Sequence, residues 1–293
     1  MKKLLNKAQT LVEALPYIRL FHGKTVVIKY GGSIGKKELS NFAHDLILMK
    51  YVGIKPVVVH GGGPQIAEHL KKQGIKSEFV AGLRVTDKKT MEIAEMVLVG
   101  KVNQEIITSI NEHDGKAVGL SGKEGKIISA KKIDIKKLAR KNGLKIPANT
   151  DIGMVGEVDN INPELIKTLE DAGYIPVIAP IGFDDKGNTY NINADHAASK
   201  IAGALNATKL VLLTDVPGIL DDKKKLISSI TESKARSLIK KDVISQGMIP
   251  KVMCALEALH EGVEKTHIID GTVERALILE IFTDSGIGTE IML

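Results

Sequence analysis

Three glycines stand where an apolar segment meets an amphipathic one. Residues 57–59 are consecutive valines, residues 61–63 are glycines, and Pro64 opens a stretch whose apolar residues recur at helical spacing. The pattern predicts a buried strand, a tight turn and a helix whose first residues need no N–H partner. Backbone N–H groups and the positive helix end would then face one crevice, which suits a phosphate or a carboxylate. A turn that only packs the helix on the sheet is the alternative interpretation.

The glycine turn matches neither of the two common nucleotide-binding loops. Ile66 occupies the third glycine position of a dinucleotide fingerprint, and no Gly-Lys-Ser/Thr follows to make a Walker A loop. A second glycine pair, Gly31 and Gly32, follows another apolar run that ends with Lys29. A lysine there would face whatever the glycines hold, and its compact ammonium group suits phosphate. A lysine that only extends from the strand end into solvent is an equally open interpretation.

Two further charged residues fit phosphate chemistry. Lys251 lies at the start of a predicted helix, where a cation opposes the helix dipole and needs a compensating anion. Asp195 lies between a predicted strand and a predicted helix, so it could orient a cation, although capping the helix is the simpler interpretation. Thr214 and Asp215 follow an apolar strand and could form a loop on the nucleotide side, or a plain turn.

One arginine and two asparagines fit recognition of a substrate that carries a carboxylate. Arg84 is one of only five arginines in a chain with thirty-six lysines. Such a chain could reserve arginine for positions where a planar fork must hold a carboxylate, although a surface arginine is the simpler interpretation. Asn191 and Asn193 alternate, so both would point to one side of an extended segment. With the glycine turns, the two lysines and Asp195, these residues supply the N–H groups and cations that phosphoryl transfer needs.

The composition limits the class of protein. At 293 residues, 43% of them hydrophobic, the chain is long enough for one large α/β unit or two closely packed lobes. The net charge of +6 is spread among acidic residues without an aromatic cluster, so we expect no nucleic-acid partner. A single cysteine, Cys254, excludes an internal disulfide and a cysteine zinc cluster, and no metal-ligand spacing is present. No apolar run reaches the length of a membrane span, so we expect a soluble, cytoplasmic protein without a membrane partner.

Strand and helix patterns alternate along most of the chain, which indicates a mostly parallel sheet covered by helices on both faces. Short apolar runs predict buried strands at 25–30, 57–59, 175–179 and 210–213. A long helix is predicted from Asp87 to about residue 112, and short strands and hairpins are predicted over 117–158. Residues 3–15 carry an apolar stripe ahead of the first strand, and we expect Pro16 to end that helix.

Six motifs, in this order along the chain, resemble those of the acetylglutamate kinases within the amino acid kinase family. They are Val27-Ile-Lys-Tyr-Gly-Gly32, His60-Gly-Gly-Gly-Pro64, Gly82-Leu-Arg-Val-Thr86, Asn191-Ile-Asn-Ala-Asp195, Leu213-Thr-Asp-Val-Pro-Gly-Ile219 and Gly247-Met-Ile-Pro-Lys251. The resemblance covers essentially the whole chain, and the order of the motifs makes it specific. It implies an α/β fold, an open three-layer αβα sandwich around a mainly parallel sheet. Residues 1–22 would be an oligomerisation helix, 23–180 a lobe that binds the acyl amino acid, and 181–293 a lobe that binds ATP.

The activity that the resemblance implies is phosphorylation of the γ-carboxylate of N-acetyl-L-glutamate by ATP. The products would be N-acetyl-γ-glutamyl phosphate and ADP, in the second step of arginine synthesis, and magnesium would be held mainly by the nucleotide phosphates. By the same resemblance, Lys29 and Lys251 would stabilise the transferring phosphoryl group and Asp195 would hold both lysines in place.

The resemblance also implies roles for the residues that would bind the two substrates. Gly62 and Gly63 would donate backbone N–H groups, Arg84 would bind the α-carboxylate, and Asn191 and Asn193 would assist around the acetamido group. The ATP site would comprise Lys29, Gly31, Gly32, Thr214, Asp215 and Lys251.

Both ends of the chain resemble the arginine-inhibited branch of the family. The motifs are Ala14-Leu-Pro-Tyr-Ile18 and Leu279-Glu-Ile-Phe-Thr-Asp-Ser-Gly-Ile-Gly288. In that branch the N-terminal helices join three dimers into a hexameric ring, and arginine binds beside the helix. The arginine site would use Tyr17, His267, Glu280 and Gly286, and a nitrogen-signalling regulator is a further possible partner.

Two other functions remain open from the sequence. A sister kinase acting on glutamate or carbamate would share the lysines and glycines but should lack the pairing of the 82–86 motif with the 191–195 motif. A non-catalytic amino-acid sensor belongs to a different class, and it would not need to keep Lys29, Asp195 and Lys251.

Overall fold

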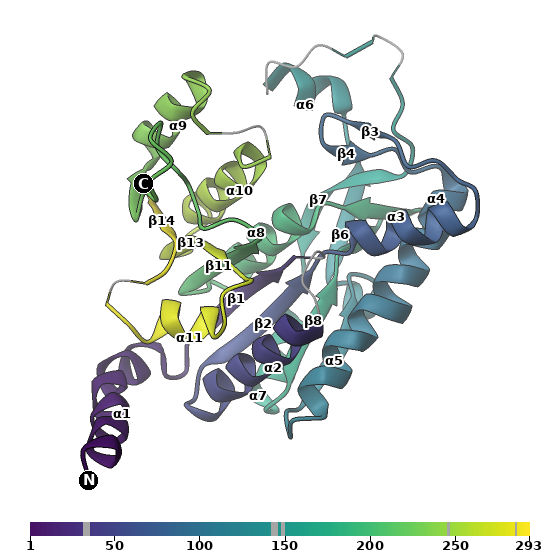
Figure 1. The fold of residues 1–293 in the computed structure, drawn as a ribbon. Helices are drawn as coiled ribbons and strands as arrows, with labels where there is room; N and C mark the ends of the chain where they lie inside the picture. The colour runs from purple at the N-terminus through teal and green to yellow at the C-terminus, as the bar shows by residue number, and fades with distance from the viewer. Residues whose placement is uncertain (32–35, 142–145, 148–149, 245–246, 285) are drawn as a thin grey trace.

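A mainly parallel sheet of eight strands forms the centre of the protein, and this confirms the predicted sheet (Figure 1). The structure is a computed structural model that describes residues 1–31, 36–141, 146–147, 150–244, 247–284 and 286–293. The strand order is β12-β14-β13-β11-β1-β2-β8-β5, and within this sheet only β13 and β14 pair antiparallel. The strands are β1 (Thr25–Tyr30), β2 (Lys55–His60), β5 (Ala117–Ser121), β8 (Ile175–Ala179), β11 (Lys209–Thr214), β12 (Ser229–Thr231), β13 (Lys265–Asp270) and β14 (Thr289–Met292).

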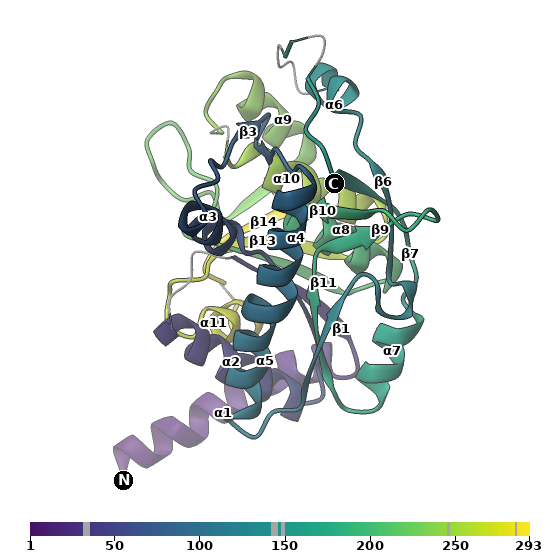
Figure 2. The same ribbon diagram turned by 90° about the vertical axis from the view of Figure 1, so that its right-hand side faces the viewer.

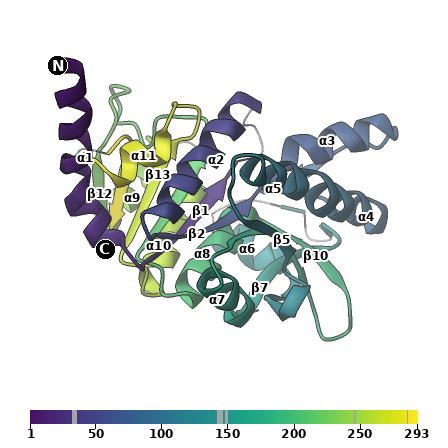
Figure 3. The ribbon, with the colours of Figure 1, turned by 90° about the horizontal axis from the view of Figure 1, so that it is seen from below.

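Helices cover both faces of this sheet, so the predicted three-layer sandwich is confirmed (Figure 3). One face carries α2 (Lys36–Tyr51), α5 (Asn103–Asn111) and α11 (Ala276–Ile281). The other carries α7 (Glu164–Asp171), α8 (Ala194–Ala204) and α10 (Ile249–His260). Further helices are α3 (Gly63–Lys72), α4 (Lys88–Val97), α6 (Ile135–Lys141) and α9 (Glu232–Lys240).

The alternation of side chains in β1 directs Lys29 toward α8 and α10. Val26 and Ile28 belong to the core cluster on the α2 face, whereas Val27 belongs to the cluster on the α8 face. Successive side chains of a strand point to opposite faces, so Lys29 points to the same side as Val27. This is the face where Asp195 opens α8 and Lys251 lies in the first turn of α10.

The segment between β5 and α8 adds a small second sheet beside the main one (Figure 2). Its strands form a closed barrel in the order β10-β7-β6-β9. They are β6 (Ile128–Lys132), β7 (Val155–Ile161), β9 (Ile181–Phe183) and β10 (Thr189–Ile192). A separate hairpin pairs β3 (Phe79–Val80) with β4 (Leu83–Arg84). The sequence predicted short strands in this region but did not predict the helix α6. The strand β10 leads directly into α8 and so brings the 191–195 motif to the centre of the molecule.

The first helix is longer than the sequence predicted, because Pro16 does not end it. Helix α1 runs from Lys2 to Phe21 with Pro16 inside. A proline removes one backbone hydrogen bond, and in an exposed helix water can serve the carbonyl group that is left free. The helix beyond the proline is held by the buried ring of Phe21 and by the bond from His22 N to Ile18 O at 2.9 Å. None of the described helices is both long and apolar enough to cross a membrane.

Candidate active site

A cavity of about 200 Å³ lies at the carboxyl ends of β1 and β2. In parallel sheets this edge is where ligands bind. The cavity brings together seven of the residues predicted from the sequence, although they come from four separate segments of the chain. They are Lys29, Gly62, Gly63, Arg84, Asn191, Asn193 and Asp195.

Asp195 bridges the two lysines that the sequence singled out. Its Oδ1 forms an ion pair with Lys29 Nζ at 2.9 Å, and its Oδ2 accepts a hydrogen bond from Lys251 Nζ at 2.9 Å. The side chains of Asp195 and Lys29 are 8% and 9% exposed, and that of Lys251 is 17% exposed. The predicted arrangement of one carboxylate between two ammonium groups is therefore present in the folded chain.

Burial and charge act in opposite directions on these three groups. Burial alone would raise the pKa of Asp195, but the two ammonium groups hold that pKa below its ordinary value. Burial lowers the pKa of Lys29, and the attraction of Asp195 offsets only part of this effect. For the less buried Lys251, attraction by Asp195 outweighs burial and raises the pKa. An ionised Asp195 between two ammonium groups leaves one net positive charge, which favours an anionic ligand.

Asn193, and not Asp195, caps helix α8. The Asn193 side-chain oxygen accepts hydrogen bonds from the backbone N–H groups of Asp195 at 2.9 Å and His196 at 3.1 Å. Capping was the simpler interpretation of Asp195 from the sequence, and the structure assigns that task to its neighbour. Asp195 is thereby left to the lysines, and Asn193 also lines the cavity.

Arg84 is a buried cation without a carboxylate partner among the described residues. Its side chain donates to the Gly63 carbonyl oxygen at 2.8 Å and to the Ser77 hydroxyl group, and the guanidinium lies over the Phe79 ring at 4.7 Å. Only 7% of Arg84 is exposed, and burial lowers its pKa. Burying an unpaired charge is costly, so the geometry favours a ligand that supplies the missing negative charge.

The glycine turn forms the floor of the cavity at the start of α3. Gly62 is the N-cap, and its carbonyl oxygen accepts from Ile66 N at 2.9 Å. No side chain caps this helix, so its first N–H groups remain for a ligand. A Cβ atom on Gly62 would lie 2.5 Å from Leu98 Cδ2, which explains why this position is a glycine.

The remaining predicted residues lie around the cavity at different distances from its centre. Asn191 lines it, and its amide nitrogen lies 3.4 Å from the Thr86 hydroxyl group. Thr214 ends β11 and Asp215 follows it, and β11 pairs with β1, so both residues lie near the Lys29 end of the cavity without lining it. Gly31 is described and close to the Leu213 carbonyl group, whereas Gly32 lies outside the described residues.

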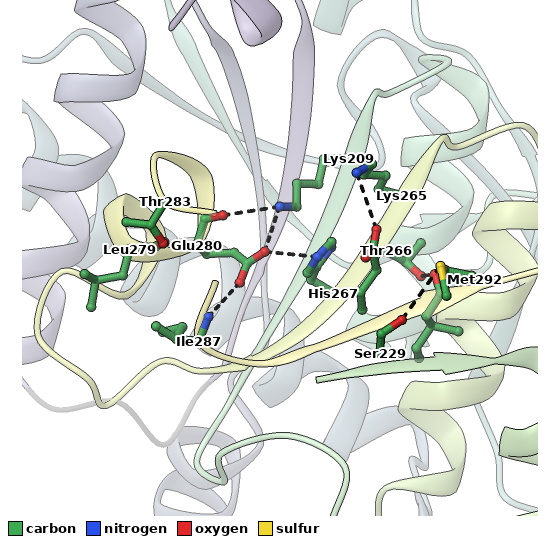
Figure 4. Close-up of polar contacts among 12 residues, drawn as sticks. Lys209, Ser229, Lys265, Thr266, His267, Leu279, Glu280, Thr283, Ile287 and Met292 are labelled. Atoms are coloured by element: carbon green, nitrogen blue, oxygen red, sulfur yellow. Dashed lines mark hydrogen bonds and ion pairs between the residues drawn. The ribbon is translucent and has the colours of Figure 1, made fainter. Parts of the chain in front are cut away.

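A second polar cluster lies on the opposite face of the sheet, against α11 (Figure 4). Glu280 Oε1 is 2.7 Å from Lys209 Nζ and 3.1 Å from His267 Nε2, and Glu280 Oε2 accepts from Ile287 N at 3.1 Å. Burial, together with the nearby charges of Lys209 and Lys265, lowers the pKa of His267 to about 2. His267 is therefore neutral, and its contact with Glu280 is a hydrogen bond rather than an ion pair.

Three of the four residues predicted for arginine binding meet in this second cluster. A Cβ atom on Gly286 would lie 2.7 Å from Glu280 Oε2, so Gly286 packs directly on the carboxylate that also contacts His267. Tyr17 contacts the segment between α11 and β14, because it donates a hydrogen bond to Asp284. The sequence did not single out Lys209, although a lysine opening an apolar strand was an available signal.

The structure also brings together His196, Cys254 and Glu257, whose potential metal-ligand atoms lie within 4.8 Å of one another. The spacing of these residues in the sequence gave no such prediction. Glu257 already accepts from His196 Nδ1 at 3.2 Å and pairs with Lys200 Nζ at 2.8 Å. Two members of this group, His196 and Glu257, are thus already engaged in hydrogen bonding and ion pairing.

A sequence model described as the amino acid kinase family matches residues 24–270. This chain belongs to the amino acid kinase family. It is 55% identical to an acetylglutamate kinase of Syntrophobacter fumaroxidans, over 99% of this chain and 97% of that protein. It is also 55% identical to an acetylglutamate kinase of Aquifex aeolicus, over the full length of both. These relatives confirm the predicted resemblance and show that this amino acid kinase family member is a phosphotransferase enzyme, which implies the use of ATP.

Solved structures of an N-acetylglutamate synthase from Neisseria gonorrhoeae share the fold of this amino acid kinase family member. The complex with coenzyme A and N-acetyl-glutamate superposes with a TM-score of 0.86 at 27% identity, covering 98% of this chain and 63% of the synthase chain. The complex with coenzyme A and L-arginine gives 0.84 at 26% identity, covering 97% and 65%. This chain therefore corresponds to slightly less than two thirds of the synthase.

Proposed function

We propose that the protein transfers the γ-phosphoryl group of ATP to the γ-carboxylate of N-acetyl-L-glutamate, in the second step of arginine synthesis. The observation that carries this proposal is Arg84, a buried cation without a carboxylate partner among the described residues, in the cavity that Lys29 and Asp195 also line. An acyl amino acid supplies the α-carboxylate that Arg84 lacks. The names of the relatives support the choice of acceptor.

The proposed reaction follows from the charges at the cavity. An oxygen of the γ-carboxylate attacks the γ-phosphorus of ATP, the bond to the β-phosphate oxygen breaks, and its electron pair leaves with ADP. Lys29 and Lys251 neutralise the charge spread over the transferring group, and Asp195 keeps both ammonium groups in place. The N–H groups of Gly62 and Gly63 add fixed donors at the positive end of α3. No proton transfer is required, because the acceptor is already ionised at neutral pH.

The cavity also offers polar groups for the rest of the acceptor and for the nucleotide. The amides of Asn191 and Asn193, which line the cavity, would bind the acetamido group. The nucleotide would be bound by Gly31, Gly32, Thr214 and Asp215. Asp195 is the only carboxylate lining the cavity among the described residues, and both its oxygens face lysines. This donor set fits a magnesium ion that arrives with the nucleotide and is held mainly by the phosphates.

We further propose that arginine inhibits the enzyme and that residues 1–22 assemble dimers into a hexamer. The Lys209–Glu280–His267 cluster, with Gly286 against it and Tyr17 reaching Asp284, provides a carboxylate and hydrogen-bonding groups for a guanidinium ligand. Binding of L-arginine by the structurally similar synthase supports this assignment. In the same proposal, residues 23–180 hold the acyl amino acid and residues 181–293 hold ATP.

The direct test is trapping of the acyl phosphate with hydroxylamine. Purified protein is incubated with MgATP, hydroxylamine and one of three acceptors, namely N-acetyl-L-glutamate, L-glutamate or carbamate, with and without arginine. We expect hydroxamate only with N-acetyl-L-glutamate, and less of it when arginine is present. Preference for glutamate or carbamate would indicate that the protein is a glutamate or carbamate kinase. Absence of product with all three acceptors would indicate a non-catalytic amino-acid sensor.

A further inference from the structure

The glycine turn is held by a buried histidine that the proposed mechanism does not use. His60 ends β2 immediately before Gly61 and is fully buried. Its Nδ1 lies 2.9 Å from the carbonyl oxygen of Gly61. A carbonyl oxygen only accepts hydrogen bonds, so Nδ1 must carry a proton. Burial lowers the pKa of His60 to about 4, so the ring is neutral at physiological pH, and its other nitrogen has a free lone pair.

Asn103 supplies the hydrogen bond that this lone pair requires. Its amide nitrogen lies 3.1 Å from His60 Nε2 and 2.9 Å from the carbonyl oxygen of Val177 in β8. Because the Val177 carbonyl only accepts, the amide nitrogen, and not the amide oxygen, must face both partners. The other side of the amide packs closely on Gly119, where a Cβ atom would lie 2.0 Å from Asn103 Oδ1. The orientation of the amide thus fixes the tautomer of the imidazole.

The helix that carries Asn103 is irregular at this point. A single π-helical turn, Leu98–Val102, separates α4 from α5, where the sequence predicted one continuous helix from 87 to about 112. Such turns are rare and occur frequently at functional sites. Leu98 from this turn packs on Gly62, and the next residue after the turn is Asn103. The irregular turn therefore contacts the glycine turn directly through Leu98. Asn103, which follows the irregular turn, contacts His60, and His60 in turn contacts Gly61.

The bond from His60 decides where the N–H group of Gly62 points. The Gly61 carbonyl and the Gly62 N–H belong to one planar trans peptide, so they point in opposite directions. Holding the carbonyl oxygen on the His60 side turns the N–H away from the imidazole. The other carbonyl groups of the turn are also engaged, Gly62 O by Ile66 N and Gly63 O by Arg84. Within the described residues, no acceptor is found for the N–H groups of Gly62 and Gly63.

We propose that His60 and Asn103 are positioning residues that aim the backbone N–H of Gly62 at the transferring phosphoryl group. They do so without touching either substrate. This inference rests on the proposed function, because it assigns the Gly62 N–H to the phosphoryl group.

Three substitutions at position 60 separate a positioning role from simple packing. In His60→Asn the short amide can place its nitrogen where Nδ1 was, so the donor to Gly61 O is kept. In His60→Gln and His60→Leu that donor is misplaced or absent. We expect kcat for N-acetyl-L-glutamate to fall about 10- to 100-fold in the Gln and Leu variants, the scale of a misdirected oxyanion donor. The Asn variant should stay within about threefold of the unchanged protein, and KM for ATP should move less than about threefold in all three.

The matched control is His44→Asn. His44 Nδ1 also lies near a backbone carbonyl, that of Ser40 at 2.8 Å, but His44 is exposed on α2 and does not line the cavity. We expect the control to keep the kcat of the unchanged protein. Near-normal kcat in His60→Leu, or an Asn variant as slow as the Gln variant, would overturn the proposal.

The tautomer is tested separately by magic-angle-spinning NMR of protein labelled with 15N-histidine. The His60 signals are assigned by their loss in His60→Asn. We expect a neutral ring with its proton on Nδ1, and the Asn103→Asp variant should move that proton toward Nε2. A proton on Nε2 in the unchanged protein would overturn the inference. Absence of activity toward N-acetyl-L-glutamate in the unchanged protein would overturn the proposed function, whereas the position of the proton is decided by NMR alone.

Discussion

Asp195 contributes one negative charge between two ammonium groups, so the site keeps one positive charge before any ligand binds. The two lysines come from β1 and α10, and the short ion pairs hold both at a fixed separation from one carboxylate. Preorganised charges of this kind stabilise a transition state without rearranging during the reaction. We therefore assign the two lysines to catalysis rather than to binding alone.

Replacing either lysine with alanine should reduce turnover more than binding. We expect Lys29→Ala and Lys251→Ala each to lower kcat about 10²- to 10³-fold, the scale of losing one preorganised charge, with smaller changes in KM. Steady-state kinetics with N-acetyl-L-glutamate and MgATP measures this. Lys55→Ala is the matched control, because Lys55 pairs with Asp171 near the surface at the other end of β2. If either variant keeps near-normal kcat, the role given to that lysine is wrong.

Replacing Arg84 with lysine should affect one substrate and not the other. Lysine keeps the charge but loses the fork, so we expect KM for N-acetyl-L-glutamate to rise by the equivalent of about 1.5–3 kcal/mol, roughly 10- to 150-fold. KM for ATP should change little. Measuring both constants in the same assay decides the matter, and an equal rise in both would place Arg84 away from the acceptor carboxylate.

At the scale of elements, the sequence predicted where strands and helices alternate. It did not predict which side chain caps a helix or where a helix continues or becomes irregular. The cap of α8 shows this, because both Asn193 and Asp195 have capping side chains, and only the folded backbone shows that Asn193 makes the bonds. Pro16 shows it again, because packing of Phe21 and solvent access around α1 decide whether the helix continues. The π-helical turn before Asn103 has no local sequence signal, since it depends on contacts with β2 and β8.

The buried position of His60 at the end of β2 predicts a measurable pH dependence of stability. Burial lowers its pKa to about 4, below the ordinary value of about 6.5 that it recovers on unfolding. Between these values the unfolded chain binds more protons than the folded chain, so the free energy of unfolding falls as pH is lowered. The contribution approaches about 1.4 kcal/mol per pH unit in the middle of this window.

Urea unfolding at pH 7.0, 6.0 and 5.0 tests this contribution. We expect His60→Asn to lose stability less steeply than the unchanged protein over this range, because its amide does not titrate. His44→Asn serves as the control for removing a histidine at the surface. Equal slopes in the unchanged protein and in His60→Asn would mean that His60 is not held neutral by burial.

Helix α1 presents an apolar stripe that its own chain does not cover. The exposed residues of α1 include six large hydrophobic side chains, namely Leu4, Leu5, Leu11, Val12, Leu15 and Leu20. In Figures 1 and 2 the start of α1 projects from the body of the molecule. Burying a larger aliphatic side chain contributes roughly 1.5–3 kcal/mol, so pairing with the same helix of another subunit is favourable and gives a two-fold contact.

Removing residues 1–16 should therefore change assembly and regulation but not chemistry. We expect the truncated protein to keep most of its kcat, to form dimers instead of hexamers, and to lose most of its inhibition by arginine. Light scattering and the hydroxamate assay measure these three properties. Leu11→Glu should act in the same direction, whereas Leu226→Glu, which alters another exposed leucine elsewhere in the chain, is the control. A truncated protein that is still hexameric and still inhibited would contradict this prediction.

At the scale of the whole molecule, local periodicity was enough to predict a parallel sheet between two helix layers. Strands buried on both faces are continuous apolar runs, as at 57–59 and 210–213, and this signal does not depend on distant residues. The order of the strands could not be predicted in this way, because pairing depends on contacts distant in sequence. The pairing of β1 with β11 is such a contact, and it brings Lys29 beside Leu212.

The candidate site was predictable to the extent that glycine turns and charged residues follow strands in a recognisable order. Lys29, Arg84 and Asp195 were identified in this way, and the structure brings them to one cavity. Asn103 and Lys209 were not, because the partners of each come from other elements of the fold. The contacts of these two residues can be recognised only in the folded structure.

The central claim is that a carboxylate oxygen of N-acetyl-L-glutamate attacks the γ-phosphorus of ATP in the cavity between Lys29 and Arg84. The most direct measurement uses N-acetyl-L-glutamate labelled with 18O at the γ-carboxylate, MgATP and hydroxylamine, followed by 31P NMR of the released phosphate. Hydroxylamine attacks the acyl carbon, so the bridging oxygen leaves with the phosphate. We predict inorganic phosphate that carries one 18O atom, in an amount equal to the hydroxamate formed. Phosphate without label would show that ATP loses its phosphoryl group to water, and that result would contradict the account.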